Sequence, residues 1–154
     1  PLRYISGNVL TGNQVKPNGY LGAFATEVTV IPEGSDVHEM LGWIMPRFDQ
    51  FSVNRSYFSW LLGKNRQYDL DARIKGGERH MIMSNEYDKV FPMDILPEYL
   101  VKAIIAGDID RMEALGIYEV APEDFALCEF VDSSKLELQR IVRSGLDTLR
   151  AEMC

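Results

Sequence analysis

The sequence predicts an α+β protein, with strands near its beginning and helices over its second half. Residues 26–31 read Thr-Glu-Val-Thr-Val-Ile, and the alternation of these mostly β-branched side chains is typical of a half-buried strand. Near the other end, apolar residues recur every three or four positions, which is the spacing of one helix face. They are Leu138, Val142, Leu146, Leu149 and Met153. We therefore expect a sheet followed by a helical region.

The beginning of the chain is expected to hold short strands joined by turns. Residues 2–5 alternate like a strand, Ser6-Gly7-Asn8 is typical of a turn, and Val9-Leu10 is expected to resume an extended run. Between Gly12 and Gly22, a high density of Gly, Asn and Pro predicts a loop. The β-branched run at residues 26–31 then forms the next strand.

The middle of the chain predicts one helix and one β-hairpin. Ser52 or Asn54 is suited to accept from the free N–H groups of a first helical turn, and Gly63 is suited to the C-terminus of the helix. Residues 68–74 and 78–83 flank a pair of glycines, and the apolar residues of the first arm fall on one face at period two. This pattern predicts a hairpin.

The rest of the chain is expected to be helical. A helix over residues 97–106 would end at a glycine, and Asp108 would cap a second helix that runs to Leu115. Pro122 suits the first turn of a helix through Phe130. Ser134 and Glu137 have the spacing of a capping box, which predicts that the last helix begins there.

Composition excludes several classes of function. The formal net charge is −7, which argues against a general nucleic-acid-binding protein, because phosphate binding needs clustered cations. Residues 93–133 carry ten acidic residues, and their only basic residues are Lys102 and Arg111. This excess of negative charge either keeps the surface soluble or binds a basic partner. No run of about 18 apolar residues is present, so we expect no membrane-spanning helix.

The residues that usually carry metal and redox chemistry are few. The chain has two cysteines, Cys128 and Cys154, and two histidines, His38 and His80, without the spacing of a zinc site or an iron–sulfur cluster. Cys128 lies in an apolar helical stretch and is predicted to be a small buried hydrophobe. Phosphate-binding glycine motifs are also missing. We therefore expect no catalytic residue, no metal ligand and no bound cofactor.

An aromatic stretch is the strongest candidate for a binding surface. Six aromatic residues fall within 18 positions, interleaved with Arg47, Arg55 and Lys64: Trp43, Phe48, Phe51, Tyr57, Phe58 and Trp60. One interpretation is a surface that faces a membrane or a partner protein. The other is an ordinary core, with Phe51, Phe58 and Leu62 pointing inward and Arg55 outward. The candidate contact residues are Trp43, Phe51, Arg55, Tyr57 and Trp60.

Several motifs, taken in order, resemble one family. They are residues 3–12 (Arg-Tyr-Ile-Ser-Gly-Asn-Val-Leu-Thr-Gly), 20–22 (Tyr-Leu-Gly), 41–46 (Leu-Gly-Trp-Ile-Met-Pro), 51–56 (Phe-Ser-Val-Asn-Arg-Ser), 85–94 (Asn-Glu-Tyr-Asp-Lys-Val-Phe-Pro-Met-Asp), 106–108, 115–116 and 123–131 (Glu-Asp-Phe-Ala-Leu-Cys-Glu-Phe-Val). This order resembles the C-terminal region of the A subunit of the Na+-translocating NADH:quinone oxidoreductases. The likeness covers nearly the whole chain, which is therefore expected to be a fragment.

The resemblance implies a domain plan. The A subunit is similar in plan to the C subunit of the electron-transport complex and to the flavin-binding subunit of complex I, in which a β-grasp domain of the soluble-ligand-binding type precedes a helical domain. By resemblance, residues 1–45 are the C-terminal part of the β-grasp domain, residues 46–92 an aromatic-rich helix and hairpin connection, and residues 93–154 the helical domain. Those relatives keep a cysteine-rich cluster motif, where this chain has Cys128 alone.

The resemblance also implies a function. The complex oxidises NADH, uses flavins, reduces ubiquinone or a related quinone, and drives Na+ outward in the respiratory chain. The A subunit is implied to be peripheral, at the cytoplasmic face of the bacterial inner membrane, with the membrane-embedded subunits as partners. We expect a cofactor-free docking or scaffold part that is not itself catalytic. The alternatives are a direct quinone-binding module, with Arg55 or Tyr57 as donor, and an acidic cytosolic adaptor unrelated to respiration.

Overall fold

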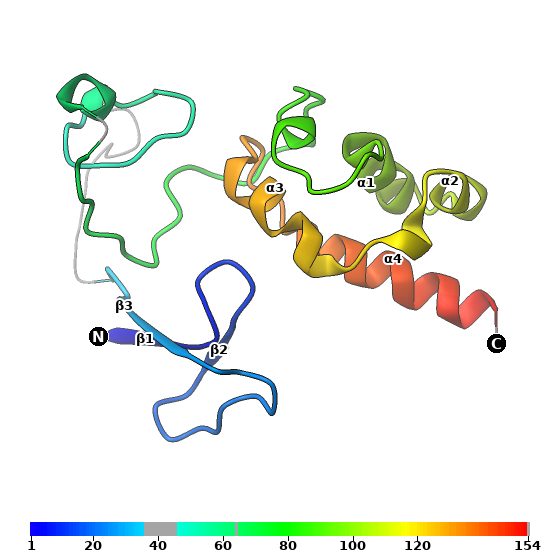
Figure 1. The fold of residues 1–154 in the computed structure, drawn as a ribbon, viewed down its shortest axis with the longest axis horizontal. Helices are drawn as coiled ribbons and strands as arrows, with labels where there is room; N and C mark the ends of the chain where they lie inside the picture. The colour runs from blue at the N-terminus through cyan, green and yellow to red at the C-terminus, as the bar shows by residue number, and fades with distance from the viewer. Residues whose placement is uncertain (36–45, 64, 154) are drawn as a thin grey trace. The chain divides into compact units, whose positions relative to one another are not determined.

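The computed structural model describes residues 1–35, 46–63 and 65–153, and these divide into two compact units, Pro1–Gly76 and Gly77–Cys154. The first unit contains a small antiparallel sheet and the second contains helices (Figure 1). This confirms the predicted α+β class. The β-grasp assignment and the domain boundaries near residues 45 and 92 stay predictions. Within the described part of the chain, no helix has the length and apolar character needed to cross a bilayer.

The sheet has three strands, and the first strand in the sequence is the central one. β1 (Leu2–Ser6) pairs antiparallel with β2 (Asn13–Val15) on one side and with β3 (Val28–Pro32) on the other. Tyr4 of β1 therefore lies opposite Val15 and also opposite Val30. The predicted strand at residues 2–5 is confirmed, and the one predicted at residues 26–31 is present but begins at Val28 and includes Pro32.

The segment between β1 and β2 differs from the prediction. Val9 and Leu10 lie in a turn rather than in an extended run, because Oδ1 of Asn8 accepts from the N–H groups of Leu10 and Thr11 at 2.9 and 2.8 Å. Asn side chains commonly compete in this way with strand hydrogen bonds. The strand resumes only at Asn13, inside the segment predicted to be a loop.

The predicted helix in the middle of the chain is mostly wrong. The structure has only a short 3-10 helix, η1 (Phe58–Leu62), which ends at Gly63 as expected. Ser52 does accept a backbone hydrogen bond, from the N–H of Ser56 at 2.9 Å, but it closes a turn and does not start a helix. Arg55 within that turn has a φ of 54°, a left-handed conformation that interrupts any helix.

The predicted hairpin over residues 68–83 is also wrong, since the described residues there form no strand. The two arms bond to other segments of their own units instead of to each other. The N–H of Ala72 donates to the carbonyl of Pro32 at 2.9 Å, and the N–H of Arg79 donates to the carbonyl of Ser134 at 2.8 Å. The period-two pattern of the first arm therefore did not lead to a strand here.

The second unit contains the helices, and most of them match the predicted boundaries. The 3-10 helix η2 (Tyr87–Lys89) precedes them, and α1 spans Pro97–Ala106, followed by α2 (Ile109–Ala114), η3 (Ile117–Glu119), η4 (Pro122–Phe125), α3 (Ala126–Val131) and α4 (Leu138–Glu152). Gly107 ends α1 in the left-handed conformation, with a φ of 69°. The carboxylate of Asp108 caps α2 by accepting from the N–H of Arg111 at 3.2 Å.

The capping-box prediction is wrong, because α4 begins at Leu138 rather than at Ser134. Ser134 is fully buried, and its hydroxyl oxygen accepts from the N–H of Ile82 at 3.2 Å. The turn before α4 is instead held by the carboxylate of Asp132. That side chain accepts from the N–H groups of Ser134 and Leu136 at 3.0 and 2.8 Å.

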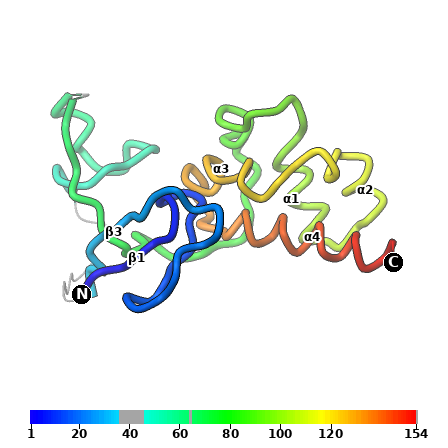
Figure 2. Tube along the Cα trace, turned by 60° about the horizontal axis from the view of Figure 1, so that its bottom comes forward, coloured from blue at the N-terminus to red at the C-terminus, as the bar shows by residue number. Residues whose placement is uncertain are grey.

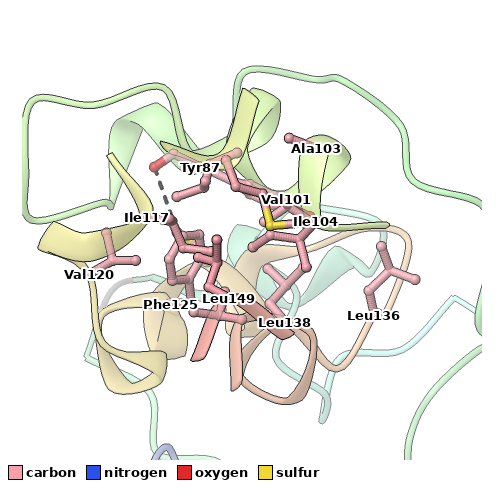
Figure 3. Packing of buried hydrophobic residues seen from close by; sticks show 14 residues of the cluster. Tyr87, Val101, Ala103, Ile104, Ile117, Val120, Phe125, Leu136, Leu138 and Leu149 are labelled. Carbon is pink, nitrogen blue, oxygen red and sulfur yellow. Dashed lines mark hydrogen bonds between the residues drawn. The ribbon is translucent and has the colours of Figure 1, made fainter. Parts of the chain in front are cut away.

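The core of the second unit is formed where α4 packs along α1 and η4 (Figures 2 and 3). The predicted stripe on α4 supplies part of it, since Leu138, Val142 and Leu149 are buried, whereas Met153 is 72% exposed. Gly145 lets α4 approach α1 closely. A Cβ atom at Gly145 would lie 2.9 Å from Cγ2 of Ile104, which is closer than carbon atoms tolerate.

Candidate functional site

The candidate site is the aromatic segment, residues 46–66, of which the structure describes all but Lys64. Its shape is set by the turn at residues 52–56, where Ser52 bonds to the N–H of Ser56 and Arg55 takes the left-handed conformation. The chain reverses there and continues into η1. The reversal brings the ring of Phe48 to a centroid distance of 6.1 Å from the ring of Phe58.

Aromatic side chains on the two sides of this turn are unequally buried. Tyr57 is only 9% exposed and Ser59 is also buried. Trp60 is 47% exposed, and Phe51 and Phe58 are exposed to a similar degree. The interpretation of this stretch as an ordinary core, with Phe51, Phe58 and Leu62 pointing inward, is therefore wrong for the described part of the unit.

Cations lie over the faces of two rings in and beside the segment. The guanidinium carbon of Arg55 lies 5.5 Å from the centre of the Trp60 ring, and that of Arg66 lies 5.9 Å from the Tyr68 ring. Tyr68 in turn packs edge-on against Phe51, with the ring centroids 5.7 Å apart. A guanidinium held over a ring face keeps its charge at the surface while the apolar ring stays beside it.

The charge of the segment is strongly positive. Residues 46–66 contain four cations, Arg47, Arg55, Lys64 and Arg66, against the single acid Asp49. Asp49 is already paired with Arg47, with Nη2 of Arg47 at 3.1 Å from Oδ2 of Asp49. The hydrogen bond from this guanidinium lowers the pKa of Asp49 to about 2, so the carboxylate stays ionised at neutral pH.

The structure describes the positions of four of the five predicted contact residues. Phe51, Arg55, Tyr57 and Trp60 all lie around the turn and η1, with Tyr57 buried and the other two rings half-exposed. Trp43 lies outside the described residues. Sequence reasoning missed Arg66 and Tyr68, which extend the same alternation of cations and rings; Tyr68 was assigned to an arm of the predicted hairpin. Their role in contact, like that of the other candidates, stays a prediction.

Cys128 on α3 lies in the core of the second unit and is fully buried, as predicted. Burial raises the pKa of the Cys128 thiol to about 12, and the nearby charges of Asp88 and Asp132 act in the same direction. Burial likewise raises the pKa of the neighbouring Tyr87 phenol. Both groups therefore stay neutral at physiological pH. Among the described residues, no group of three or more His, Cys, Asp or Glu side chains is placed to hold a metal ion.

The burial of Cys128 predicts that its thiol is unreactive in the folded protein. In a Cys154→Ser background, iodoacetamide at pH 8 should label Cys128 at least about 100-fold more slowly than a free thiol, because the reactive species is the thiolate. Labelling is measured by mass spectrometry over time, in buffer and in 6 M guanidinium chloride as the unfolded control. Rapid labelling without denaturant would show that Cys128 is accessible and ionised.

Comparison with known proteins gives the chain a family. It is 42% identical over 151 residues to the A subunit of a Na(+)-translocating NADH-quinone reductase from Serratia proteamaculans, and 42% identical over 152 residues to the one from Rhodopirellula baltica. The corresponding A subunit from Neisseria meningitidis is 38% identical over 151 residues. No protein-family model matches the chain.

These alignments cover the chain much more fully than they cover the relatives. The alignments with the subunits from Serratia and Neisseria cover 97% of this chain, and the alignment with the subunit from Rhodopirellula covers 98% of it. Each of the three alignments covers 33% of the relative. The chain thus spans about one third of the length of the curated relatives it matches. Identity near 40% over so long an alignment leaves no doubt of common descent. By its sequence, the chain is homologous to about one third of the A subunit of the Na+-translocating NADH-quinone reductases.

Proposed function

We propose that the chain is the C-terminal third of the A subunit and acts as a docking part of a Na+-pumping NADH:quinone oxidoreductase. In this role it carries no electron itself. It holds the A subunit at the cytoplasmic face of the membrane, against the membrane-embedded subunits that export Na+. The homology with A subunits of this family supports this role over that of an acidic cytosolic adaptor unrelated to respiration.

The observation that carries the proposal is the exposure of the aromatic segment. Along residues 48–62, several large apolar side chains are about half exposed to solvent. Contiguous exposed apolar area of this kind is uncommon on a protein surface that has no binding partner. Trp, Tyr and Arg are also the residues that contribute most binding energy in interfaces. Arg55 already lies over the Trp60 ring in a cation–π contact. The two side chains therefore lose less conformational entropy when a partner binds.

The proposal predicts that the exposed side chains of the segment are needed for assembly. Phe51→Ala, Arg55→Ala and Trp60→Ala in the complete complex should each weaken retention of the A subunit by roughly tenfold or more, since interface anchors typically contribute at least about 2 kcal/mol. Retention is measured by gel filtration of the purified complex at falling concentration, and turnover by NADH-dependent quinone reduction.

Phe24→Ala is the matched control, because Phe24 is an exposed phenylalanine of the same unit outside the segment. It should leave retention unchanged. If all three segment variants assemble and turn over like the wild type, the docking role is wrong.

Direct quinone binding is the second candidate, and a groove in the second unit favours it. The groove has a volume of about 550 Å³ and apolar walls from Met81, Met83 and Tyr99, with the cations Lys102 and Arg111 on its lining. This volume suits a small aromatic ligand, and a cation could donate to a quinone carbonyl. An NMR titration with a short-chain quinone tests this: shifts confined to the groove would support it, and an unchanged spectrum would refute it.

A further inference from the structure

We propose that the aromatic segment docks directly on the anionic lipid surface of the membrane. The inference rests on the docking role proposed above and names the partner of the same residues. The juxtaposition that carries it is a run of half-exposed apolar side chains on η1, with guanidinium groups lying over the rings in and beside it.

The side chains of η1 have the character of a shallow membrane anchor. Trp60, Leu61 and Leu62 follow one another on η1 and are all about half exposed, whereas the neighbouring Tyr57 and Ser59 are buried. Tryptophan favours the boundary between headgroups and acyl chains, since its ring is apolar and its N–H is polar. Arg55, held over the Trp60 ring, is placed to reach the phosphates while that ring enters the boundary.

The distribution of charge selects an anionic partner for this segment. Residues 46–66 carry four cations and one acid, a net charge of +3, with the acid paired to Arg47. The second unit, residues 77–154, has the opposite balance, with sixteen acids against eight Lys and Arg residues. A negatively charged leaflet therefore attracts the aromatic segment and repels the acidic helical unit, so that contact through the segment is preferred.

The form of the surface favours lipid over a protein partner. A protein partner would require a shape-matched interface whose central part is depleted of charge. In the aromatic segment, by contrast, the cations Arg55 and Arg66 lie directly over exposed or partly exposed rings. A bilayer boundary accepts such mixed side chains without any fixed complementary shape.

The test is binding of the 154-residue chain to lipid vesicles. Vesicles of phosphatidylcholine alone are compared with vesicles containing 30% phosphatidylglycerol, at low salt and at 0.5 M NaCl, by co-sedimentation. In a Trp43→Phe background, the fluorescence of Trp60 reports whether its ring leaves water. We expect binding to the anionic vesicles only, a blue shift of Trp60 emission, and at least about tenfold weaker binding at high salt.

Two variants locate the contact. Arg55→Glu and Trp60→Ala should each weaken vesicle binding by about tenfold, while Arg140→Glu, a charge reversal at an exposed residue of α4, should not weaken it. Circular dichroism and the urea midpoint confirm that every variant is folded. The proposal is overturned if the chain binds neutral and anionic vesicles equally or binds neither. It is also overturned if Arg55→Glu and Trp60→Ala bind anionic vesicles as tightly as the wild type.

The lipid proposal and the docking role fail in different ways. If the segment variants lose assembly but the wild-type chain does not bind anionic vesicles, the partner is a protein and the lipid proposal is wrong. If vesicle binding depends on Arg55 and Trp60 but their variants assemble normally, the lipid contact stands and the docking role is wrong.

Discussion

Replacing Phe125 with alanine is expected to destabilise the helical unit by about 3–5 kcal/mol, the usual cost of deleting a buried phenylalanine ring. Phe125 is 0% exposed, lies at the end of η4 and belongs to the buried core of the helical unit (Figure 3). Its ring centroid is 4.7 Å from that of Phe91. The truncation would remove this ring contact and leave a cavity that the surrounding helices fill only in part.

A loss of this size is a large fraction of the total stability of a domain, which is typically about 5–15 kcal/mol. Urea unfolding followed by circular dichroism at 222 nm measures it, because most of the helical signal comes from the second unit. Phe130→Ala is the matched control, since Phe130 is a half-exposed phenylalanine on the adjoining α3. It should cost less than about 1 kcal/mol. Equal losses for the two variants would show that Phe125 is not a core residue.

The parts of the fold that could be predicted from the sequence are those decided by neighbouring residues. The bounds of α1 follow from Pro97 at its first turn and Gly107 just after its last, because each residue acts on the backbone beside it. The cap of α2 is similarly local, since Asp108 bonds to an amide three residues along the chain. The burial of Cys128 follows from its apolar neighbours on one helix.

The parts that could not be predicted depend on partners distant in the sequence. Ala72 bonds to Pro32 rather than to a hairpin arm, and no pattern near Ala72 specifies that partner. Ser134 has the spacing of a capping box, but it is drawn into the core by Ile82, which lies 52 residues earlier. In each case the sequence has the local pattern of a hairpin arm or of a capping box. A hydrogen bond to a residue distant in the sequence nevertheless determines the local structure.

The residues of the candidate site could be predicted from the sequence, but which of their side chains face solvent could not. The density of rings and cations marked residues 43–60 as the strongest candidate in the chain. Which rings face solvent depends on the left-handed Arg55, since that residue ends any helical repeat before η1. A helical reading of the same residues would place Phe51 and Phe58 together on one inward face. A non-glycine residue at positive φ is rare, so the sequence carried no signal for it.

The turn before α4 yields the second large prediction: Asp132→Ala should destabilise the helical unit by about 2–4 kcal/mol, because two buried amides lose their acceptor. The carboxylate of Asp132 is buried and accepts from the N–H groups of Ser134 and Leu136. The alanine variant leaves both amides buried without this acceptor, and each such group costs about 1–3 kcal/mol. Lys135 between them is held at a φ of 57°, a conformation that these two bonds stabilise against its intrinsic cost.

Asp132→Asn separates the hydrogen bonds from the charge. The amide keeps one acceptor oxygen, which can serve one of the two N–H groups, so its cost should be about half that of the alanine variant. The comparison uses the urea midpoint and the slope of the transition, with Glu137→Ala, at an exposed residue just before α4, as the control that tests the predicted capping box. If Glu137→Ala costs more than Asp132→Ala, the hydrogen bonds of Asp132 are not what holds the turn. If Asp132→Ala costs more, the turn is held by a residue outside the capping-box pattern, in keeping with the start of α4 at Leu138 rather than at Ser134.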